Sequence, residues 1–373
     1  MSLKNKVMNS IVNIYLNRKF NLQASFNDFD PNRNSPYILL SNNPSLLDGL
    51  LISKFLKTKP VMVLNELQKT SKRNNYFLSK HENHIFKNHS GYDVSLIKEI
   101  HTLLSEKPVL IFPEKQTSFF GNESQISESI AKLIKKERKD VVICKVNGAY
   151  LSNPRWGLKN SKKGLVELSF TTIYKENQID SIEVNEIIDT LRNQLKYNDF
   201  EWNREFKNFY YPKNRALGLE GYLYICPRCL KSQTLSTKKN DIYCSECGHI
   251  ASFDDFSLIN GLDFDDLVSW DILQKNELAR LANEVVYSSG SMFSVDLKTM
   301  ELYPLGYADL EIMKGQLFVL NKMKEYMFEI EKIKDLKFVR RNELFFKYGK
   351  KSYLFKLDDP MIIYDSINYI KEK

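Results

Sequence analysis

The residues best suited to chemistry are two pairs of cysteines. "CPRC" (226–229) and "CSEC" (244–247) repeat the spacing Cys-x2-Cys, with fourteen residues between the pairs. Each pair can bring two thiolates within about 4 Å of one another, and two pairs complete a tetrahedral site of four sulfurs. Such a closed site leaves no open coordination position, so we expect it to hold a structural zinc ion. The expected ligands are Cys226, Cys229, Cys244 and Cys247, with His249 as an alternative ligand.

A zinc ribbon can also bind nucleic acid, so the charges around the cysteines matter. They are mixed, and no aromatic platform for stacking bases lies among the basic residues. The charged residues are Arg228, Lys231, Lys238, Lys239, Asp241 and Glu246. We therefore expect a scaffolding role for the ribbon and keep nucleic-acid binding as the alternative.

A second candidate site lies in "SNNPSLLDGLL" (41–51). Asn43 and Pro44 are typical of a helix N-cap and first helical residue, which predicts a helix from 44 to 57. A cap does not explain Asp48, an acid among leucines, where an unpaired charge is costly. A further polar block, "FPEKQTS" (112–118), follows an apolar run.

The elements that position these blocks alternate between residues 37 and 175. Apolar runs predict strands, and amphipathic runs between them predict helices, which together indicate an α/β fold with a mostly parallel sheet flanked by helices. Both polar blocks then lie at the carboxyl ends of strands, where such sheets bind ligands. The expected strands are 37–41, 60–64, 108–112, 140–146 and 165–174, and the expected helices are 44–57, 94–107, 124–139 and 182–197.

The rest of the chain changes character several times. The last part consists of short β-prone runs with a hairpin turn at Gly349-Lys350 and a closing helix with Ile363, Ile367 and Ile370 on one face. This pattern resembles a pleckstrin-homology-like module. We expect four parts: 1–200, the α/β domain with an amphipathic N-terminal helix; 201–251, a connector and zinc ribbon; 252–290, a helical linker; and 291–373, the β-rich module.

Composition limits the class of protein. The chain has 373 residues, of which 43% are hydrophobic and 12% aromatic, so global disorder is excluded. No apolar run approaches the roughly 20 residues of a spanning helix, and the first residues do not read as a secretory signal. Five cysteines do not indicate a disulfide scaffold, and Cys144 is expected to be buried. The net charge of +8 is compatible with anionic lipid, nucleic acid or phosphorylated substrates.

Three blocks resemble the 1-acylglycerol-3-phosphate acyltransferase family. The family block Asn-His-x4-Asp stands here as Asn42-Asn43-x4-Asp48, and the block Phe-Pro-Glu-Gly followed by Thr/Arg/Ser stands as residues 112–118. The run "VVICKVNGAYLSNPRW" matches the last family block in position but lacks its usual proline. Lys87 is the nearest basic residue for an intermediate block. The ribbon and the C-terminal module lie outside this resemblance.

The resemblance implies direct acyl transfer from a thioester of coenzyme A or acyl carrier protein. A histidine at position 43 would remove the proton from a glycerol hydroxyl, and Asp48 would orient and stabilise the imidazolium. The turn with Glu114, Lys115, Thr117 and Ser118, together with Lys87, would hold the glycerol phosphate. We expect the blocks to converge on one apolar cleft that accepts a fatty chain.

Asn43 departs from the family at the position of the base. An asparagine side chain takes up no proton at neutral pH, and general-base catalysis is worth typically about 10² to 10⁴-fold. Three explanations stay open: an engineered His→Asn exchange, a natural protein that binds without turnover, and a different base. The histidines His81, His84 and His89 cluster between the blocks, either in a solvated loop or as a metal tract.

The sequence therefore predicts an acyltransferase that moves a fatty acyl group to a lysophospholipid hydroxyl, with its base replaced. The first alternative is a non-catalytic lipid-binding protein whose C-terminal lysines contact membrane, and the second is a nucleic-acid-binding zinc protein. Expected partners are lysophospholipid, acyl thioester, anionic membrane and acyl carrier protein. The expected location is cytoplasmic, peripheral on the inner face of the membrane. The lysine-rich set is Lys322, Lys324, Lys332, Lys334, Lys337, Arg340, Arg341 and Lys347.

Overall fold

The structure is a computed structural model that describes residues 3–79, 83–88, 94–157, 163–210, 213–322 and 324–373. The chain divides into two compact units, which are described separately. The first unit comprises residues 1–155 and 161–212, and the second comprises residues 156–160 and 213–373. The finer division into four parts stays a prediction.

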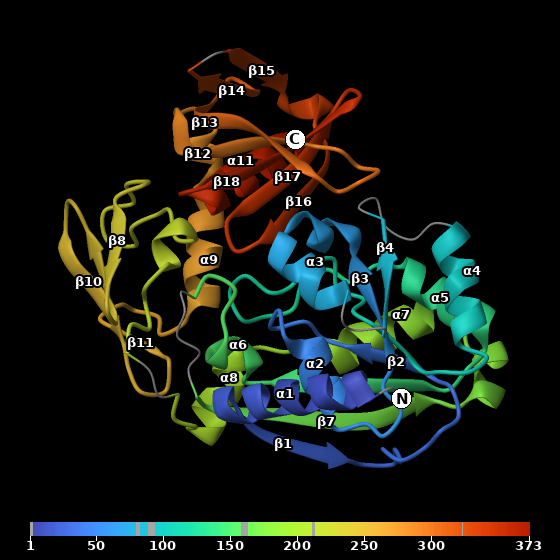
Figure 1. The fold of residues 1–373 in the computed structure, drawn as a ribbon. Coiled ribbons are helices and arrows are strands. Elements are labelled where there is room, and N and C mark those ends of the chain that lie inside the picture. The colour runs from blue at the N-terminus through green and yellow to red at the C-terminus, as the bar shows by residue number, and fades with distance from the viewer. Residues whose placement is uncertain (1–2, 80–82, 89–93, 158–162, 211–212, 323) are drawn as a thin grey trace. The chain divides into compact units, whose positions relative to one another are not determined.

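The first unit is built on a seven-stranded sheet with the order β1-β7-β6-β2-β5-β3-β4 (Figure 1). Five of the six neighbouring pairs are parallel, and only β6 and β7 are antiparallel. This confirms an α/β unit with a parallel-containing sheet. The strands are β1 (Asn21–Phe26), β2 (Ile38–Ser41), β3 (Val61–Asn65), β4 (His84–Lys87), β5 (Val109–Ile111), β6 (Val141–Asn147) and β7 (Leu165–Tyr174).

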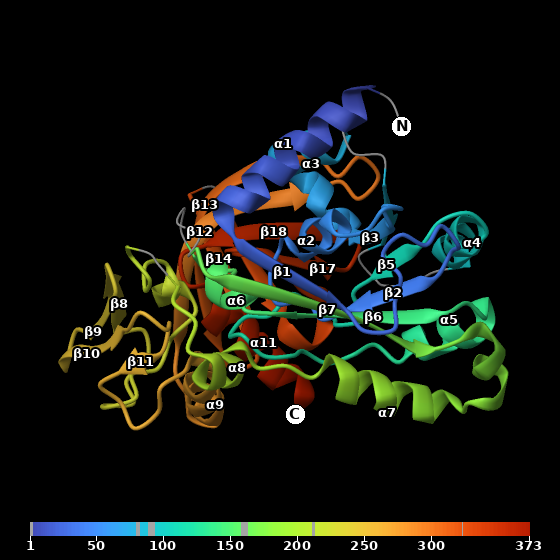
Figure 2. The same cartoon turned by 90° about the horizontal axis from the view of Figure 1, so that it is seen from below.

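Both faces of this sheet are buried because its central strands are apolar on both sides. Ile38 and Leu40 of β2 pack into one cluster, with side chains from α4, α5 and α7, whereas Leu39 packs into the other, with α1 and α2. Figure 2 shows α1 and α2 on one side of the sheet and α5 and α7 on the other. The helices are α1 (Leu3–Lys19), α2 (Asp48–Lys54), α3 (Lys72–Ser79), α4 (Val94–Leu103), α5 (Ser129–Glu137), α6 (Ala149–Ser152), α7 (Val184–Leu195) and α8 (Asp199–Phe206).

The prediction that Asn43 caps a helix is wrong. Helix α2 begins at Asp48, its N-cap residue is Leu47, and no side chain caps it. The segment before it stays irregular because its polar groups have other partners. The backbone N–H of Asn43 donates to Glu114 and that of Ser45 donates to Asp48.

The second unit begins with a four-stranded antiparallel sheet in the order β11-β10-β9-β8. Its strands are β8 (Leu235–Lys238), β9 (Asp241–Cys244), β10 (Gly248–Phe253) and β11 (Ile259–Asn260). Helices α9 (Leu267–Asn276) and α10 (Leu278–Leu281) follow. Only part of the segment 252–290 is therefore helical, since β10 ends inside it and the next strand begins at Val286.

The C-terminal part is a seven-stranded antiparallel sheet in the order β15-β14-β13-β12-β18-β17-β16, followed by helix α11 (Pro360–Glu372). Gly349 adopts a φ of 58° in the turn between β17 and β18, as the sequence predicts for this hairpin. The strands at 286–295 and 325–329 were not among the expected β-prone runs. The strands are β12 (Val286–Val295), β13 (Leu302–Met313), β14 (Gln316–Asn321), β15 (Glu325–Glu329), β16 (Lys334–Arg340), β17 (Glu343–Tyr348) and β18 (Lys351–Leu357).

Helix length and polarity limit how the chain can meet a bilayer. A spanning helix needs about 20 apolar residues. Within the part of the chain that the structure describes, no helix is both long enough and apolar enough to cross a membrane.

Candidate functional site

The two polar blocks of the first unit are in direct contact. They follow β2 and β5, which are neighbouring parallel strands, so both blocks emerge at the same edge of the sheet. The backbone N–H of Asn43 donates to Glu114 Oε1 at 2.9 Å, and the backbone N–H of Ser118 donates to the carbonyl of Asn43 at 3.0 Å. The backbone N–H and carbonyl of Asn43 thereby connect two segments that lie about seventy residues apart in the chain.

Asp48 is buried beneath this contact, with a side chain only 1% exposed. Its Oδ2 atom accepts the backbone N–H of Ser45 at 2.7 Å. Its Oδ1 atom is buried and has no hydrogen-bond partner among the described residues. Burial raises the pKa of Asp48 well above its ordinary value, and the nearby carboxyls of Asp199 and Glu114 raise it further. The acid is thus held ready to accept a hydrogen bond that no described residue supplies.

Glu114 joins the two blocks and is itself 2% exposed. Its Oε2 atom accepts the backbone N–H of Ser124 at 2.9 Å, while Oε1 accepts that of Asn43. Burial raises the pKa of Glu114 to about 8, although both backbone donors favour the ionised form. Because each of its two oxygens accepts a backbone N–H, Glu114 connects the loop after β2 to the loop after β5.

Asp199, which the sequence did not single out, completes this arrangement. It opens helix α8, and its Oδ2 atom accepts the backbone N–H of Tyr150 at 2.9 Å. Its own backbone N–H donates to the carbonyl of Gly121 at 2.9 Å. Burial raises its pKa to about 7. We call Asp48, Glu114 and Asp199 the carboxyl cluster; no local pattern connects them, because sheet order brings them together.

Asn42 belongs to the block 42–48, but the sequence predicted no role for it. Its side-chain amide donates to the carbonyl of Val146 at 2.8 Å and accepts the backbone N–H of the same residue at 2.8 Å. Asn42 is fully buried, so this paired bond ties the end of β2 to the end of β6. Its position next to Asn43 in the block was the available signal.

The other residues predicted for the 112–118 turn have different surroundings. Lys115 is exposed and its ammonium group donates to Gln125. The carbonyl of Thr117 accepts a hydrogen bond from Arg155 at 3.1 Å. The hydroxyl of Ser118 is buried, donates to the carbonyl of Asn122 and accepts the N–H of Gly121, so it stabilises the turn itself.

Lys87 is placed apart from these residues. It ends β4, the edge strand, and lies opposite Asn65 of β3. Three strand spacings separate β4 from β2, which amounts to about 14 Å. Of the three clustered histidines, His84 lies in β4 and not in a loop, while His81 and His89 fall outside the described residues.

The cavity nearest to helix α2 in the described part of the chain differs from the expected cleft for a fatty chain. A cavity of about 60 Å³ lies beside α2 and is lined by residues that include Val12, Leu50 and Met62. Neither Asn43 nor Asp48 lines it. Its volume matches about two water molecules, so it does not accommodate an acyl chain.

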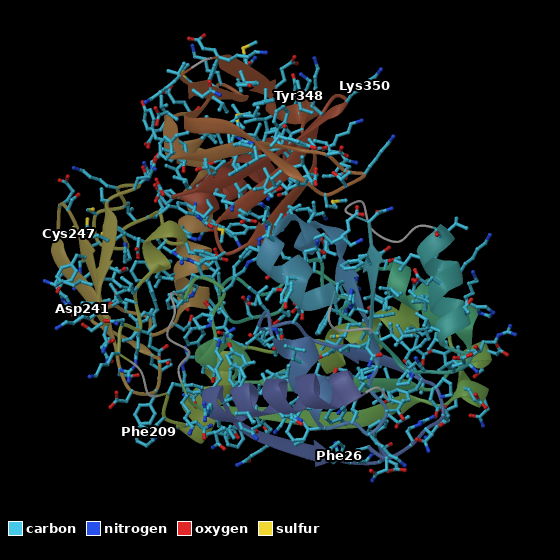
Figure 3. All side chains as sticks on the ribbon, viewed as in Figure 1. Phe26, Phe209, Asp241, Cys247, Tyr348 and Lys350 are labelled. Atoms are coloured by element: carbon cyan, nitrogen blue, oxygen red, sulfur yellow. The ribbon has the colours of Figure 1, made fainter. Side chains whose placement is uncertain are left out.

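The four cysteines of the second unit form a compact cluster. The distance between the Sγ atoms of Cys226 and Cys247 is 4.0 Å, and that between Cys229 and Cys244 is 3.8 Å. All four sulfurs lie within 4.8 Å of one another. A tetrahedral ion with metal–sulfur bonds of about 2.3 Å requires sulfur separations near 3.8 Å. The cluster could therefore hold one metal ion; Figure 3 shows Cys247 next to the ribbon strands.

Two of the basic residues near the cysteines are engaged within the ribbon. The Arg228 guanidinium donates to the carbonyls of His249 and Ile250, each at 2.9 Å. Lys231 pairs with Glu246 at 2.9 Å. These contacts use the basic groups to brace the ribbon, which fits a scaffold.

No protein-family model and no curated protein matches this chain. Among solved structures, the chain is similar to the 1-acyl-sn-glycerophosphate (LPA) acyltransferase PlsC from Thermotoga maritima. The identity is 17%, the match covers 54% of this chain and 79% of that chain, and the TM-score is 0.43. A similarity of this size assigns neither the fold nor the function of this chain.

Proposed function

We propose that the first unit is an acyltransferase-type domain that brings an acyl thioester and a lysophospholipid together, with its general base replaced by Asn43. The observation that carries the proposal is the contact between the block 42–48 and the turn 112–118 above the unsatisfied Oδ1 atom of Asp48. Both blocks resemble those of the 1-acylglycerol-3-phosphate acyltransferases. We expect the unsatisfied Oδ1 atom of Asp48 to lie within reach of a histidine at position 43 and to accept its ring N–H.

The chemistry would be direct transfer. The acceptor hydroxyl attacks the thioester carbonyl, its proton must leave, and the thiol departs. Asn43 offers an amide but takes up no proton, so we expect turnover to be lowered by about 10² to 10⁴-fold relative to a histidine. Asp48 would orient that histidine, and Glu114 keeps the two blocks in register.

The acceptor is proposed to be a lysophospholipid such as 1-acylglycerol-3-phosphate, and the donor a thioester of coenzyme A or acyl carrier protein. Lys115 is the exposed cation of the turn, and its flexible side chain can exchange Gln125 for a phosphate oxygen. Lys87 ends β4, two strand spacings or about 10 Å from β5, and we propose it as a second cation for the same phosphate.

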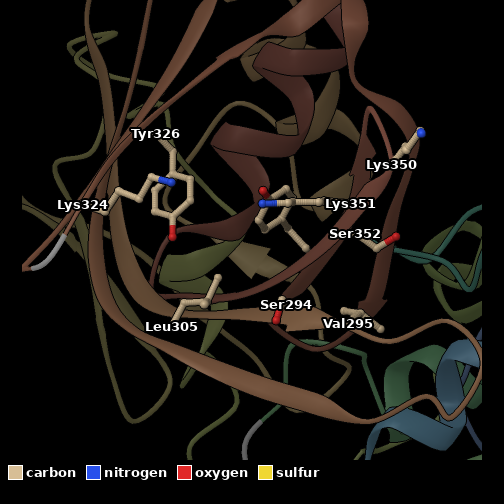
Figure 4. Close-up of a pocket in the computed structure, with 9 residues that line it drawn as sticks. Ser294, Val295, Leu305, Lys324, Tyr326, Lys350, Lys351 and Ser352 are labelled. Atoms are coloured by element: carbon tan, nitrogen blue, oxygen red, sulfur yellow. The ribbon is translucent and has the colours of Figure 1, made fainter.

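We also propose peripheral attachment to the inner, anionic face of a membrane. Helix α1 has basic Arg18 and Lys19 in its last turn and no acid in its first, which favours contact with anionic headgroups. Its Val12 and Leu16 side chains pack into the core of the unit, so the proposed attachment rests on these charges. Seven antiparallel strands followed by one helix support the comparison of the C-terminal part with a pleckstrin-homology-like module. In that part, three lysines and two tyrosines surround a cavity of about 340 Å³ (Figure 4); they are Lys324, Lys350, Lys351, Tyr326 and Tyr353.

The metal of the second unit is proposed to be zinc. Four thiolates in a closed tetrahedron are a typical structural zinc site. The ion would stabilise the ribbon and take no part in acyl transfer, because four protein ligands leave it no position for substrate.

The decisive experiment restores the base. Purified Asn43→His protein is assayed for acyl transfer from long-chain acyl-CoA and acyl carrier protein to 1-acylglycerol-3-phosphate, beside the unchanged chain. We expect a gain of about 10² to 10⁴-fold. The double variant Asn43→His/Asp48→Asn should lose most of that gain, because the imidazolium loses its carboxylate.

A binding measurement on the unchanged chain separates the alternatives. Retained binding of thioester and lysophospholipid, without transfer even after Asn43→His, would favour a non-catalytic lipid-binding protein. Absence of both transfer and binding would refute the proposal that the first unit is an acyltransferase-type domain.

A further inference from the structure

The outer face of strands β12 to β15 presents apolar and acidic side chains side by side. Across the sheet, Tyr287 lies opposite Glu311, and the next partners in that row are Phe318 and Met327. In the neighbouring row, Asp309 lies opposite Leu320, and Leu320 lies opposite Glu325. Opposed residues point to the same side of a sheet, as do residues two apart on one strand. We call Tyr287, Asp309, Glu311, Leu320, Glu325 and Met327 the acidic–apolar face.

The apolar members of this face are largely open to solvent. Tyr287 is 51% exposed, Leu320 52% and Met327 57%. Single exposed apolar side chains are ordinary, but a contiguous group on one sheet face typically marks a contact surface. Tyrosine and methionine are also enriched at protein–protein contacts. The face therefore has the composition of an interface.

The charge of the face is the opposite of that of the chain. The four strands contain the acids Asp309, Glu311, Glu325 and Glu329 and no lysine or arginine, although the whole chain has 54 such residues and a net charge of +8. Glu329 is paired with Lys332 at 2.7 Å. Lys322 is exposed and follows β14 two residues after Leu320, so it offsets one of the three remaining acids. The face stays net negative, which favours basic groups.

We propose that the acidic–apolar face docks a cationic amphipathic helix of a partner protein, in which lysines or arginines flank an apolar stripe. Leucine-like side chains of such a helix would cover Leu320 and Met327, and its basic flanks would meet Asp309, Glu311 and Glu325. The width fits, because the row from Tyr287 to Met327 crosses three strand spacings, or about 14 Å. A helix with its side chains is about 10 to 12 Å across. The inference is independent of the proposed acyl transfer.

The test uses a defined probe and the full chain. A fluorescein-labelled 14-residue amphipathic helix of leucine and lysine is titrated at low salt and followed by anisotropy, beside the same peptide with glutamate for lysine. We expect the lysine peptide to bind at least about tenfold more tightly, and salt to weaken it. Glu311→Lys should weaken its binding about fivefold or more.

A matched variant controls for net charge. Glu331 is exposed on η4 (Ile330–Lys332), outside the four strands, and Glu331→Lys changes the charge equally. We expect it to leave the affinity nearly unchanged. Leu320→Ser tests the apolar half of the face, and because Leu320 is exposed, its unfolding temperature should match that of the parent.

Several outcomes would overturn the proposal. Equal binding of the lysine and glutamate peptides would show that charge does not select the partner. Equal effects of Glu311→Lys and Glu331→Lys would show that the acidic–apolar face is not the binding site. Sedimentation velocity supplies a third test. A concentration-dependent dimer that Glu311→Lys dissociates would show a second copy as the occupant instead of a separate basic partner.

Discussion

The carboxyl cluster of the first unit and the cysteine cluster of the second both concentrate groups that can carry negative charge. In the carboxyl cluster, burial raises the pKa values of Asp48, Glu114 and Asp199 and so favours their neutral forms. The sulfur separations of the cysteine cluster suit a metal ion, which would neutralise four thiolates. The two clusters should therefore respond to pH in opposite directions.

The second difference lies in how each cluster is assembled. The cysteines come from two short turns, each spanning four residues. The carboxyl groups come from the loop after β2, the loop after β5 and the start of α8. Local turns can place thiolates before the rest of the chain folds, whereas the carboxyl groups meet only when the sheet has formed.

The largest expected effect comes from removing the metal. Cys226→Ser, or a chelator acting on the full chain, should abolish one equivalent of bound zinc and unfold the ribbon, because zinc binding to such sites is worth about 10 kcal/mol or more. Native mass spectrometry measures the metal, and amide exchange in β8 to β10 measures the unfolding. Cys144→Ser, a buried cysteine outside the cluster, is the control and should retain the metal. A full equivalent of zinc bound to Cys226→Ser would contradict the assignment of Cys226 as a metal ligand.

The next effect is the pH dependence of the first unit. Glu114 has a pKa of about 8 against an ordinary value of 4.5, so between these values the folded state holds a proton that the unfolded state has released. Stability should therefore fall as pH rises from about 5 to 8, by up to about 1.4 kcal/mol per pH unit from this group. Amide exchange of β2 and β5 across that range is the measurement.

Variants identify Glu114 as the origin of that slope. Glu114→Gln should flatten it. Glu128→Gln, which alters the exposed N-cap residue of helix α5, should leave it unchanged. The cysteine cluster should show the opposite sign, since metal affinity rises with pH as thiols lose protons. If the stability of both units rose with pH over this range, the expected difference in sign between the two clusters would be wrong.

A smaller effect is expected at Asn42. Asn42→Ala leaves the buried N–H and carbonyl of Val146 without their side-chain partner, which should cost about 2 to 4 kcal/mol of unfolding free energy. Urea denaturation measures it. Asn34→Ala is the control, because Asn34 is exposed. Equal losses in the two variants would show that the bond between the ends of β2 and β6 contributes little.

The smallest effect is expected at Lys115. Its side chain is exposed and bonded only across the turn to Gln125, so Lys115→Ala should change the unfolding free energy by less than about 0.5 kcal/mol. In the Asn43→His background it should raise KM for a phosphate-bearing acceptor about two- to fivefold at low salt. Lys132→Ala, on helix α5, is the matched control. An unchanged KM would exclude Lys115 from phosphate binding.

Much of the architecture followed from periodicity. The apolar runs at 37–41 and 108–112 became β2 and β5, and the amphipathic run after Asp93 became α4. The predicted start of a helix was wrong where the expected capping residue had a tertiary partner instead. Asn43 reads locally as a helix cap, but Glu114 takes up its backbone N–H, and the helix begins five residues later.

Residue spacing alone predicts the cysteine cluster, the alternation of strands and helices, and the resemblance of two polar blocks to those of acyltransferases. Those features depend on spacings of a few residues, which the backbone converts directly into geometry. The proximity of Asp199 to Asp48 and Glu114, and the place of Lys87 on an edge strand, follow from the folded sheet alone. Strand order and loop contacts join residues far apart in the chain, and no local period encodes that order.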